Sequence, residues 1–399
     1  PFMRRISLLC VLATNLVVLS FPFARDTRAS TDDWPQAQGD ARRSGHAPSA
    51  TLPNKLGLLG TIRATDSILA SPVVADGRVF VIDASGVVIA ANVDELEEIW
   101  RVDTTPLIAP IAKRRTSVDP SGGHNVGNIA APAVAGEHLH VGTVGGVHFV
   151  LRAATGEVVR AIDCGEPIFS SPVVTERGVY VATLGSRLLA LDPDGAERFR
   201  WDFVRERLGF DGDRWDGAAW AARGKRATWR DQFLCSRDLA VAPDGTIVLP
   251  AGGAVVWLAD KGDRADFLAE YRGSRESPAT LGLSIASDGR VYRQWHRRDN
   301  NGDVEILSRS AEGHRVGAVP GTETSYKGDG LISFAPVAVR GDDVFRSRPE
   351  HGRGVVLHPA TGDARVLVEE GTLAPPAVTE DALVTGGLDG VLRVVPIDP

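Results

Sequence analysis

The sequence lacks most of the features that would assign a chemistry to it. Its 399 residues include three cysteines, one methionine and four tyrosines, and aromatic residues make up 6% of the chain. It contains no histidine pair at the spacing that holds zinc, no Gly-x-Ser-x-Gly nucleophile motif and no phosphate-binding loop. It also lacks a basic excess, since its net charge is -7, so we expect no nucleic-acid partner.

Long apolar runs are scarce, and the one that stands out is at the amino end. A basic start is followed by the apolar run Ile6–Phe23, and charged residues resume at Arg25. This order predicts a secretory signal peptide over residues 1–29, and therefore a periplasmic or extracellular protein. The alternative is an uncleaved membrane anchor, for which the run is barely long enough. Contact with a membrane is expected only through such an anchor.

Cysteine is nearly absent beyond the signal, where only Cys164 and Cys235 remain. Exported cysteines often pair in an oxidising compartment, and these two lie on either side of one repeat. A disulfide between them is one interpretation, and two separate buried thiols are the other.

What the sequence does contain is a pattern that returns about every 40 residues. SPVVADGRVFVI from Ser71 and SPVVTERGVYVA from Ser171 share a Pro-led start, small apolar residues, a turn and an alternating strand. Seven such units begin near Ser71, Ala131, Ser171, Arg237, Thr280, Ala335 and Pro375. Because one all-strand unit cannot bury both faces of its sheet, the units must pack against one another.

The repeat predicts an all-β fold, a seven-bladed β-propeller of four-stranded antiparallel blades. An eight-bladed ring would need a hidden blade, which the spacing does not favour. The seventh unit has room for three strands, and the apolar segment Lys55–Ala64 is the candidate for the fourth, because it would remove exposed sheet edges. We expect an extended segment over 30–54, one propeller domain over 55–399, and a monomer.

The units resemble the PQQ-like propeller repeat of quinoprotein dehydrogenases and outer-membrane assembly lipoproteins. The likeness rests on the Pro-led starts and on the turn before the outer strand, as in Ala154-Thr155-Gly156-Glu157. The opening DWPQAQGD (Asp33–Asp40) is similar to the segment before the first blade in exported members. The family's outer-strand tryptophan, which docks one blade on the next, is kept only as Trp100; the equivalent residues are Arg160, Phe199 and Val366.

For function the resemblance is less specific, because the repeat occurs in enzymes, scaffolds and sensor domains. A quinoprotein dehydrogenase needs a PQQ sandwich, a metal site and a catalytic carboxylate. The family's large alcohol dehydrogenases often carry an adjacent Cys-Cys pair, which is absent here. We therefore predict no catalytic residue, no cofactor and no metal, with PQQ and Ca²⁺ as the alternative.

Surplus residues interrupt the period at Asp103–Ile129, Asp202–Ser236 and Arg309–Ser333. Connections of this kind leave a propeller on one face, and insertions that gather on one face often mark a binding face. The middle one holds three of the eight tryptophans, and a fourth, Trp201, directly precedes it. Trp and Arg are enriched at binding hot spots. The candidate binding residues are Trp215, Trp220, Trp229, Arg223, Arg226 and Arg230. The alternative is a cap packed against itself.

Two further signals are weaker. The stretch Asp299–Glu305 has oxygen ligands at alternate positions, as Ca²⁺ loops do, but its Asn-Gly pair favours a hairpin turn. His138 and His140 alternate on one strand and His148 lies on the next, and we interpret them as solvent-exposed rather than as a cluster.

Together these features favour an exported, non-catalytic propeller that binds a protein or polysaccharide partner at the cell envelope. The alternative is an enzyme, either a divergent PQQ-dependent dehydrogenase or another activity with its site under the capped face. A sensor domain of a signalling protein is a third reading.

Overall fold

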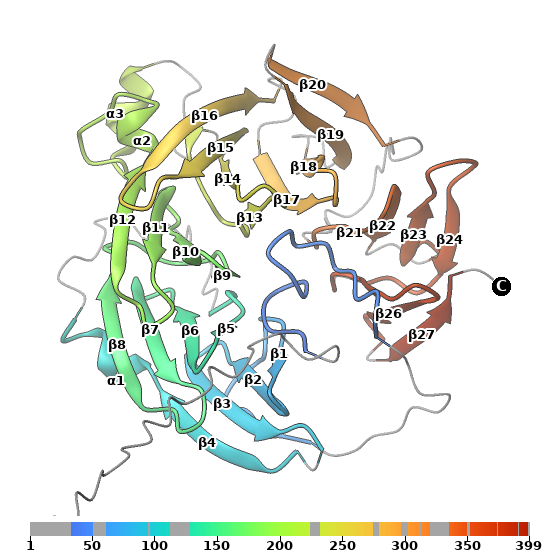
Figure 1. Cartoon of the computed structure of the whole chain (residues 1–399), viewed down its shortest axis with the longest axis horizontal. Helices are drawn as coiled ribbons and strands as arrows, with labels where there is room; N and C mark the ends of the chain where they lie inside the picture. The colour runs from blue at the N-terminus through green and yellow to red at the C-terminus, as the bar shows by residue number, and fades with distance from the viewer. Residues whose placement is uncertain are drawn as a thin grey trace, which may run out of the picture.

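The computed structural model describes residues 33–50, 61–94, 96–111, 128–223, 232–273, 279–296, 302–310, 313–319, 335–348, 352–372, 374–389 and 391–397. Its strands form seven sheets arranged in a ring, so the predicted seven-bladed β-propeller is confirmed (Figure 1). Among the described residues helix is nearly absent, with short helices at α1 (Thr105–Ile108), α2 (Phe203–Glu206) and α3 (Gly217–Ala222). None of these described helices is long and apolar enough to cross a membrane.

The blades follow one another in chain order, with the first strand of each nearest the axis and the last at the rim (Figure 1). Blade 1 is β1–β4 (Val73–Ala75, Arg78–Ile82, Val87–Asn92, Glu98–Asp103), and blade 2 is β5–β8 (Ala133–Ala135, His138–Gly142, Val147–Arg152, Val158–Asp163). Blade 3 is β9–β12 (Val173–Thr175, Gly178–Ala182, Arg187–Leu191, Glu197–Asp202), and blade 4 is β13–β16 (Ala240–Val241, Ile247–Ala251, Ala254–Asp260, Ala265–Arg272). Blades 5 to 7 are β17–β20 (Ala279–Ile285, Val291–His296, Gly302–Ser310, Gly313–Ala318), β21–β24 (Ala338–Arg340, Asp343–Ser347, Val355–His358, Arg365–Val368) and β25–β27 (Ala377–Val378, Ala382–Gly386, Leu392–Pro396).

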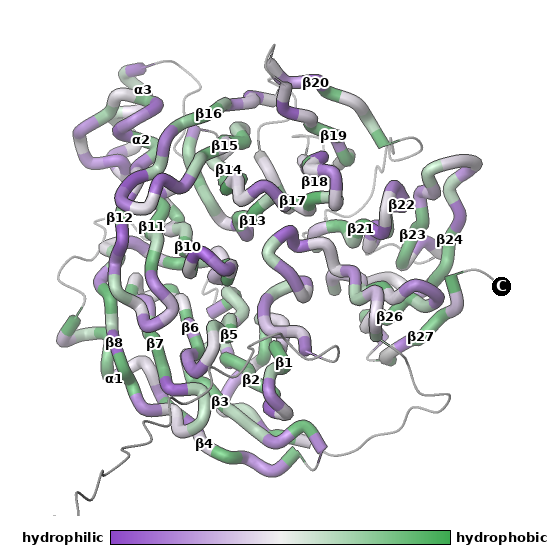
Figure 2. Tube along the Cα trace, in the orientation of Figure 1, coloured by the Kyte–Doolittle hydropathy of each residue, from purple (hydrophilic) through white to green (hydrophobic). Residues whose placement is uncertain are grey.

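The middle strands of each blade are apolar because neighbouring blades cover both of their faces. In blade 3, β10 and β11 are buried at nearly every residue, whereas the rim strand β8 of blade 2 begins with three exposed residues. Figure 2 shows the same contrast between the hydrophobic strands β14 and β15 and the hydrophilic rim strand β12. The core is therefore a series of clusters between blades.

Rim side chains join one blade to the next. The Trp100 indole of blade 1 donates a hydrogen bond of 3.0 Å to the Ala153 carbonyl of blade 2. Its ring lies on the turn at Gly156, where a Cβ would come within 2.8 Å of it. Between blades 2 and 3 the tryptophan is replaced by Arg160, whose Nε donates to the Asp194 carbonyl at 3.3 Å. The docking role that the resemblance implied for Trp100 is thus seen in the structure.

The seventh blade has three strands in the described part of the chain. Residues 55–60 of the segment predicted to complete it lie outside the described residues. The described end of that segment carries no strand: Ile62 and Ala64 pack on Val81 and neighbouring side chains of blade 1. The Arg63 carbonyl accepts a hydrogen bond of 2.8 Å from the guanidinium of Arg101.

The amino-terminal segment meets the seventh blade at another place, on the axis of the ring. Figure 1 shows this segment in blue between the inner strands, where residue 46 forms a parallel bridge to Val378 of β25. The segment was expected to be extended, but it curves, because Gln38, Gly39, Arg43 and Gly45 adopt positive φ.

Candidate functional site

The long connection after β12 builds a cap on blade 3. Asp202, at the end of β12, starts α2 by accepting hydrogen bonds from the backbone N–H groups of Val204 and Arg205. Asp216 starts α3 in the same way, with its side chain accepting from Ala218 at 2.9 Å. These are ordinary N-caps, which satisfy the free N–H groups of a first helical turn. The capping aspartates therefore place both short helices.

Two of the predicted binding tryptophans form the base of this cap. The exposed fractions of Trp215 and Trp220 are only 4% and 2%. Both rings pack on Phe233, at centroid distances of 5.6 and 5.3 Å, and Phe210 covers Trp220 at 4.6 Å. The Trp220 indole N–H is satisfied by the Arg214 carbonyl at 2.7 Å. These two side chains are packed inside the cap, as the alternative of a self-packed cap predicted, and neither has a face free to bind a ligand.

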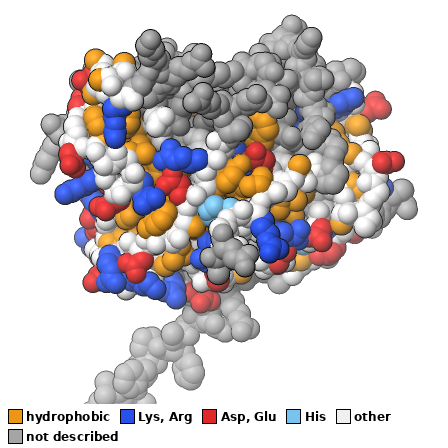
Figure 3. Space-filling view, turned by 90° about the horizontal axis from the view of Figure 1, so that it is seen from above, with side chains coloured by type: hydrophobic (Ala, Val, Ile, Leu, Met, Phe, Trp, Pro, Cys, Tyr) orange, Lys and Arg blue, Asp and Glu red, His pale blue; other side chains and the backbone are white. Residues whose placement is uncertain are grey.

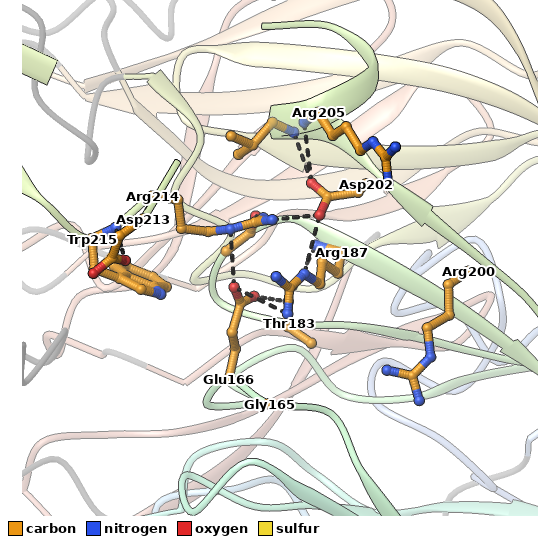
Figure 4. Close-up of polar contacts among 12 residues, drawn as sticks. Gly165, Glu166, Thr183, Arg187, Arg200, Asp202, Arg205, Asp213, Arg214 and Trp215 are labelled. Atoms are coloured by element: carbon orange, nitrogen blue, oxygen red, sulfur yellow. Dashed lines mark hydrogen bonds and ion pairs between the residues drawn. The ribbon is translucent and has the colours of Figure 1, made fainter. Parts of the chain in front are cut away.

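Beside Trp215 lies a network of two carboxylates and two guanidinium groups (Figure 4). Arg214 joins Glu166, at 3.1 Å, to Asp202. Arg187 bridges the same two carboxylates, at 3.5 Å to Glu166 and 3.1 Å to Asp202. Thr183 completes the ring by donating to Glu166 at 2.7 Å. The network ties the connection before blade 3 to the strand and cap that follow it.

The charges in this network balance, which is what allows the nearly fully buried Glu166 to be tolerated. Burial raises the pKa of Asp202, but the hydrogen bonds and charges of Arg214 and Arg187 outweigh it and hold that pKa below its usual value. Gly185 is required beside the network, because a Cβ there would lie 2.3 Å from a Glu166 oxygen. The network fixes the position of the cap, and its two carboxylates are both paired, so neither is free to act as an acid or a base.

The outer surface of the cap is polar and exposed. Arg205 and Asp211 face each other at 3.6 Å with 73% and 84% of their side chains exposed. Arg223, a predicted binding residue, is exposed, lies near the Phe210 and Trp220 rings and donates to the Leu208 carbonyl at 2.8 Å. Figure 3 looks onto the rim that is uppermost in Figure 1 and shows charges of both signs, with apolar groups between them.

The remaining sequence predictions have mixed outcomes. Trp229, Arg226 and Arg230 lie outside the described residues, as do residues 1–32. Cys164 and Cys235 are free and buried, so the interpretation as separate thiols describes the structure and the disulfide is not formed. Their side chains belong to different core clusters, which explains why they do not meet.

The interpretation of the histidines as exposed is wrong for two of the three. His140 and His148 are fully buried, with His140 Nδ1 and His148 Nε2 3.0 Å apart. Both faces of their strands are covered by neighbouring blades, so alternation does not bring either side chain to solvent. The segment 299–305 lies partly outside the described residues; its end belongs to β19, which pairs with β18 from Gly302, as the hairpin interpretation requires.

The quinoprotein alternative requires room for a planar cofactor and a cation among the residues where the blades converge. Residues 33–47 occupy the axis, and the completely buried Arg43 guanidinium hydrogen-bonds to the carbonyls of Ser171 and Leu239 there. Within the described residues, no three His, Cys, Asp or Glu side chains lie together so as to hold a metal ion. The axial residues do not fit PQQ with Ca²⁺, and we assign no reaction step to that group.

Comparison with known proteins identifies the family. A family model described as outer membrane protein assembly factor BamB matches residues 114–365, more than half of the chain. The chain belongs to this PQQ-like propeller family. The match confirms the resemblance that the repeats indicated. No curated protein is significantly similar to the chain in sequence.

Solved structures share the fold at low sequence identity. A europium-containing methanol dehydrogenase is 12% identical, with a TM-score of 0.58 over 92% of this chain and 84% of its own. A quinohemoprotein alcohol dehydrogenase from Pseudomonas putida HK5 is 13% identical, with a TM-score of 0.56 over 91% and 70%. The Cps50 (Swd1) β-propeller domain of Myceliophteria thermophila is 12% identical, with a TM-score of 0.53 over 85% and 98%. At these identities the likeness is one of fold alone.

Sequence reasoning missed the residues that hold the cap in place. Glu166, Thr183 and Arg187 lie in ordinary repeat positions, and only their meeting with Arg214 makes a network. One signal was present in the sequence. Glu166 is a charged residue just before the apolar start of a blade, where side chains are usually buried, and a buried charge needs a partner.

Proposed function

We propose that the protein is an exported, non-catalytic module that holds a protein or polysaccharide partner at the cell envelope through the capped face of blade 3. The observation that carries this proposal is the construction of the cap. Its interior is fixed by Trp215, Trp220 and the charge network, whereas its outer residues are exposed and polar. A rigid scaffold that presents an exposed loop is a common arrangement for binding.

The exposed charges contribute little to the cap's own stability. Surface ion pairs such as Arg205 with Asp211 are typically worth about 0–1 kcal/mol, because water screens them. Their pairing is easily exchanged for pairing with a partner, which makes them suitable for recognition. Arg223 contributes a planar guanidinium beside aromatic rings, a group suited to carboxylates and to partner loops.

Family membership supports a binding role over a catalytic one. The family model is described by an assembly factor of the outer membrane, and an assembly factor acts on partner proteins. The predicted signal peptide over residues 1–29 supports export of the protein to the cell envelope. A protein partner is therefore the first candidate, and a polysaccharide the second.

Site-specific photo-crosslinking in the native envelope tests the proposal. A crosslinking residue at Ala218, on the exposed side of α3, is compared with one at Glu137. Glu137 is a matched control because it is exposed in the turn after β5, at the end of the inner strand remote from the capped connections. We expect one defined adduct from Ala218 and none from Glu137.

Equal labelling from both positions, or no adduct from Ala218, would contradict the capped face as the binding surface. A separate assay addresses the enzyme alternative: purified protein is mixed with PQQ and Ca²⁺ and tested for dye reduction with alcohols and sugars. Reduction above that of the cofactor alone would overturn the non-catalytic assignment.

A further inference from the structure

The axial segment, residues 33–47, makes a set of contacts that the proposed binding role does not explain. It hydrogen-bonds to the inner strand of every blade in turn. Backbone carbonyls of the segment accept from Val74 (2.9 Å), Val134 (2.8 Å), Val241 (2.7 Å), Ile285 (2.9 Å), Val339 (2.7 Å) and Val378 (2.8 Å). In blade 3 the side-chain carbonyl of Gln36 accepts from Val174 at 3.0 Å instead. All seven donors are β-branched residues of the innermost strands.

These seven N–H groups are the inward edge of the propeller. The inner strand of each blade is paired on one side only, so its other edge presents backbone groups that need partners. A peptide on the axis satisfies them by adding backbone to a sheet edge, which is a recurring mode of peptide recognition. The ring thus offers a peptide-binding site with one donor from each blade.

Arg43 gives this site a side-chain preference. It is completely buried, and it donates to Ala37 at 2.7 Å, to Ser171 at 2.9 Å, to Pro172 at 3.0 Å and to Leu239 at 3.3 Å. The carboxylate of Asp238 lies 4.0 Å away. Three of these carbonyls belong to blades 3 and 4, so the arginine ties the segment to ring residues far along the chain.

The segment is also shaped to its channel. Gly45 has φ of 64°, and a Cβ there would lie 2.8 Å from Ala338 and 2.9 Å from the Pro376 carbonyl. The Gln38 side chain reaches the Val337 carbonyl at 3.1 Å. The segment therefore has the properties of a fitted ligand rather than of a linker.

We propose that the axial channel is a peptide-binding site whose resident ligand is the chain's own segment 33–47, and that this segment clasps the seven blades by non-covalent contacts alone. The link through residues 51–60 is then dispensable once the protein has folded. A free peptide of the same sequence binds the same site, and Arg43 determines its selectivity.

The test uses the full chain with a protease recognition site placed in the connection 51–60. The protein is folded, cleaved, and challenged with a labelled peptide of residues 33–50. Competing peptides carry Arg43→Met or, as the matched control, Arg42→Met. Arg42 is the neighbouring arginine, but its side chain is 29% exposed and pairs with Asp40, within the same segment.

We expect the cleaved segment to co-purify with the propeller and to exchange slowly with the labelled peptide. The Arg43→Met peptide should compete at least about 100-fold more weakly than the native one, because it leaves several buried carbonyls without a donor. The Arg42→Met peptide should compete within about threefold of the native peptide, as for a surface substitution. Because the substitutions sit on the peptide, neither depends on folding of a variant propeller.

Dissociation of the cleaved segment with no change in the unfolding temperature would overturn the proposal. Equal competition by the two variant peptides would overturn the role of Arg43. Exchange of segments between two copies, seen as a dimer in size-exclusion chromatography, would overturn binding within one chain.

Discussion

The buried histidine pair of blade 2 makes the protein sensitive to acid. His140 Nε2 lies 2.9 Å from the Pro193 carbonyl, and a carbonyl only accepts, so this nitrogen carries the proton. His140 Nδ1 therefore accepts from His148 Nε2 at 3.0 Å. Both rings are neutral in this arrangement. A proton added to either one would place a charge in a buried space between apolar strands.

Burial lowers the pKa of His140 from its ordinary 6.5 to about 4. Burial, together with repulsion from His140 once that ring is protonated, lowers the pKa of His148 well below the same ordinary value. Since the folded pKa lies below the unfolded one, the unfolded chain takes up the proton first as the pH falls. The contribution of neutral His140 to the free energy of unfolding is complete above about pH 6.5, and it is lost as the pH falls from there to about 4. Linkage gives a loss of about 2–3 kcal/mol from His140 alone between about pH 7.5 and pH 4.5.

Urea unfolding at these two pH values measures the loss. The double variant His140→Gln/His148→Gln removes the titrating groups, so the difference between the free energies of unfolding at the two pH values should shrink by about 2–3 kcal/mol relative to the native chain. His138→Gln, a change at a half-buried histidine on the same strand, should leave most of the difference in place, because burial is the main cause of the low pKa of His140. If the double variant loses as much stability on acidification as the native chain, the reasoning about buried neutral rings is wrong.

Three further changes test the packing described above. Gly156→Ala should destabilise the fold by about 1–3 kcal/mol more than Gly362→Ala, because both have positive φ but only position 156 faces the Trp100 ring; urea midpoints compare them. Trp220→Ala should cost about 3–5 kcal/mol and speed proteolysis of the cap, and an unchanged digestion rate would contradict its structural role. Burial raises the pKa of Cys164 and Cys235 to about 12, so a thiol reagent at pH 8 should label both only in denaturant; no labelling in denaturant would reveal a disulfide.

The blades were predictable because their signal is local. A Pro-led start, a turn and an alternating strand lie within a few residues of each other, and the pairing of β1 with β2 or of β9 with β10 follows from that order. The fourth and fifth units, predicted to begin near Arg237 and Thr280, have their first strands at Ala240 and Ala279. In the fourth unit, where the Pro-led start is lost, β14 and β15 remain apolar.

Burial of individual side chains was less predictable, because it depends on which blade lies opposite. His140 and Leu139 are neighbours on β6 and both are buried, so strand alternation could not separate a core face from a solvent face. The cap shows the same difficulty. Trp220 is as apolar in a binding surface as in a core, and only its contacts with Phe210 and Phe233 decide between them.

The axial clasp, the set of contacts between residues 33–47 and the inner strands, could not be predicted from the sequence for a different reason. Residues 33–47 have no hydrophobic period, and their partners are backbone groups, which carry no sequence signal. The contacts are also distant in the chain, as with Gln38 and Val337, which are 299 residues apart. The recurrent β-branched residue at the inner strand marks a blade, but it does not reveal what lies opposite it.

The position of the clasp in the chain has a consequence for folding. The segment is the first described part of the chain to be synthesised, yet its hydrogen-bond partners extend to Val378 in the last blade. Contacts of such high sequence separation form late, because the loop between them must be closed first. Each blade supplies one backbone N–H donor to the segment, so only a complete ring provides all seven of these hydrogen bonds. The clasp therefore stabilises the closed seven-bladed ring over any partly assembled one, and Arg43 becomes buried only when blades 3 and 4 are both in place.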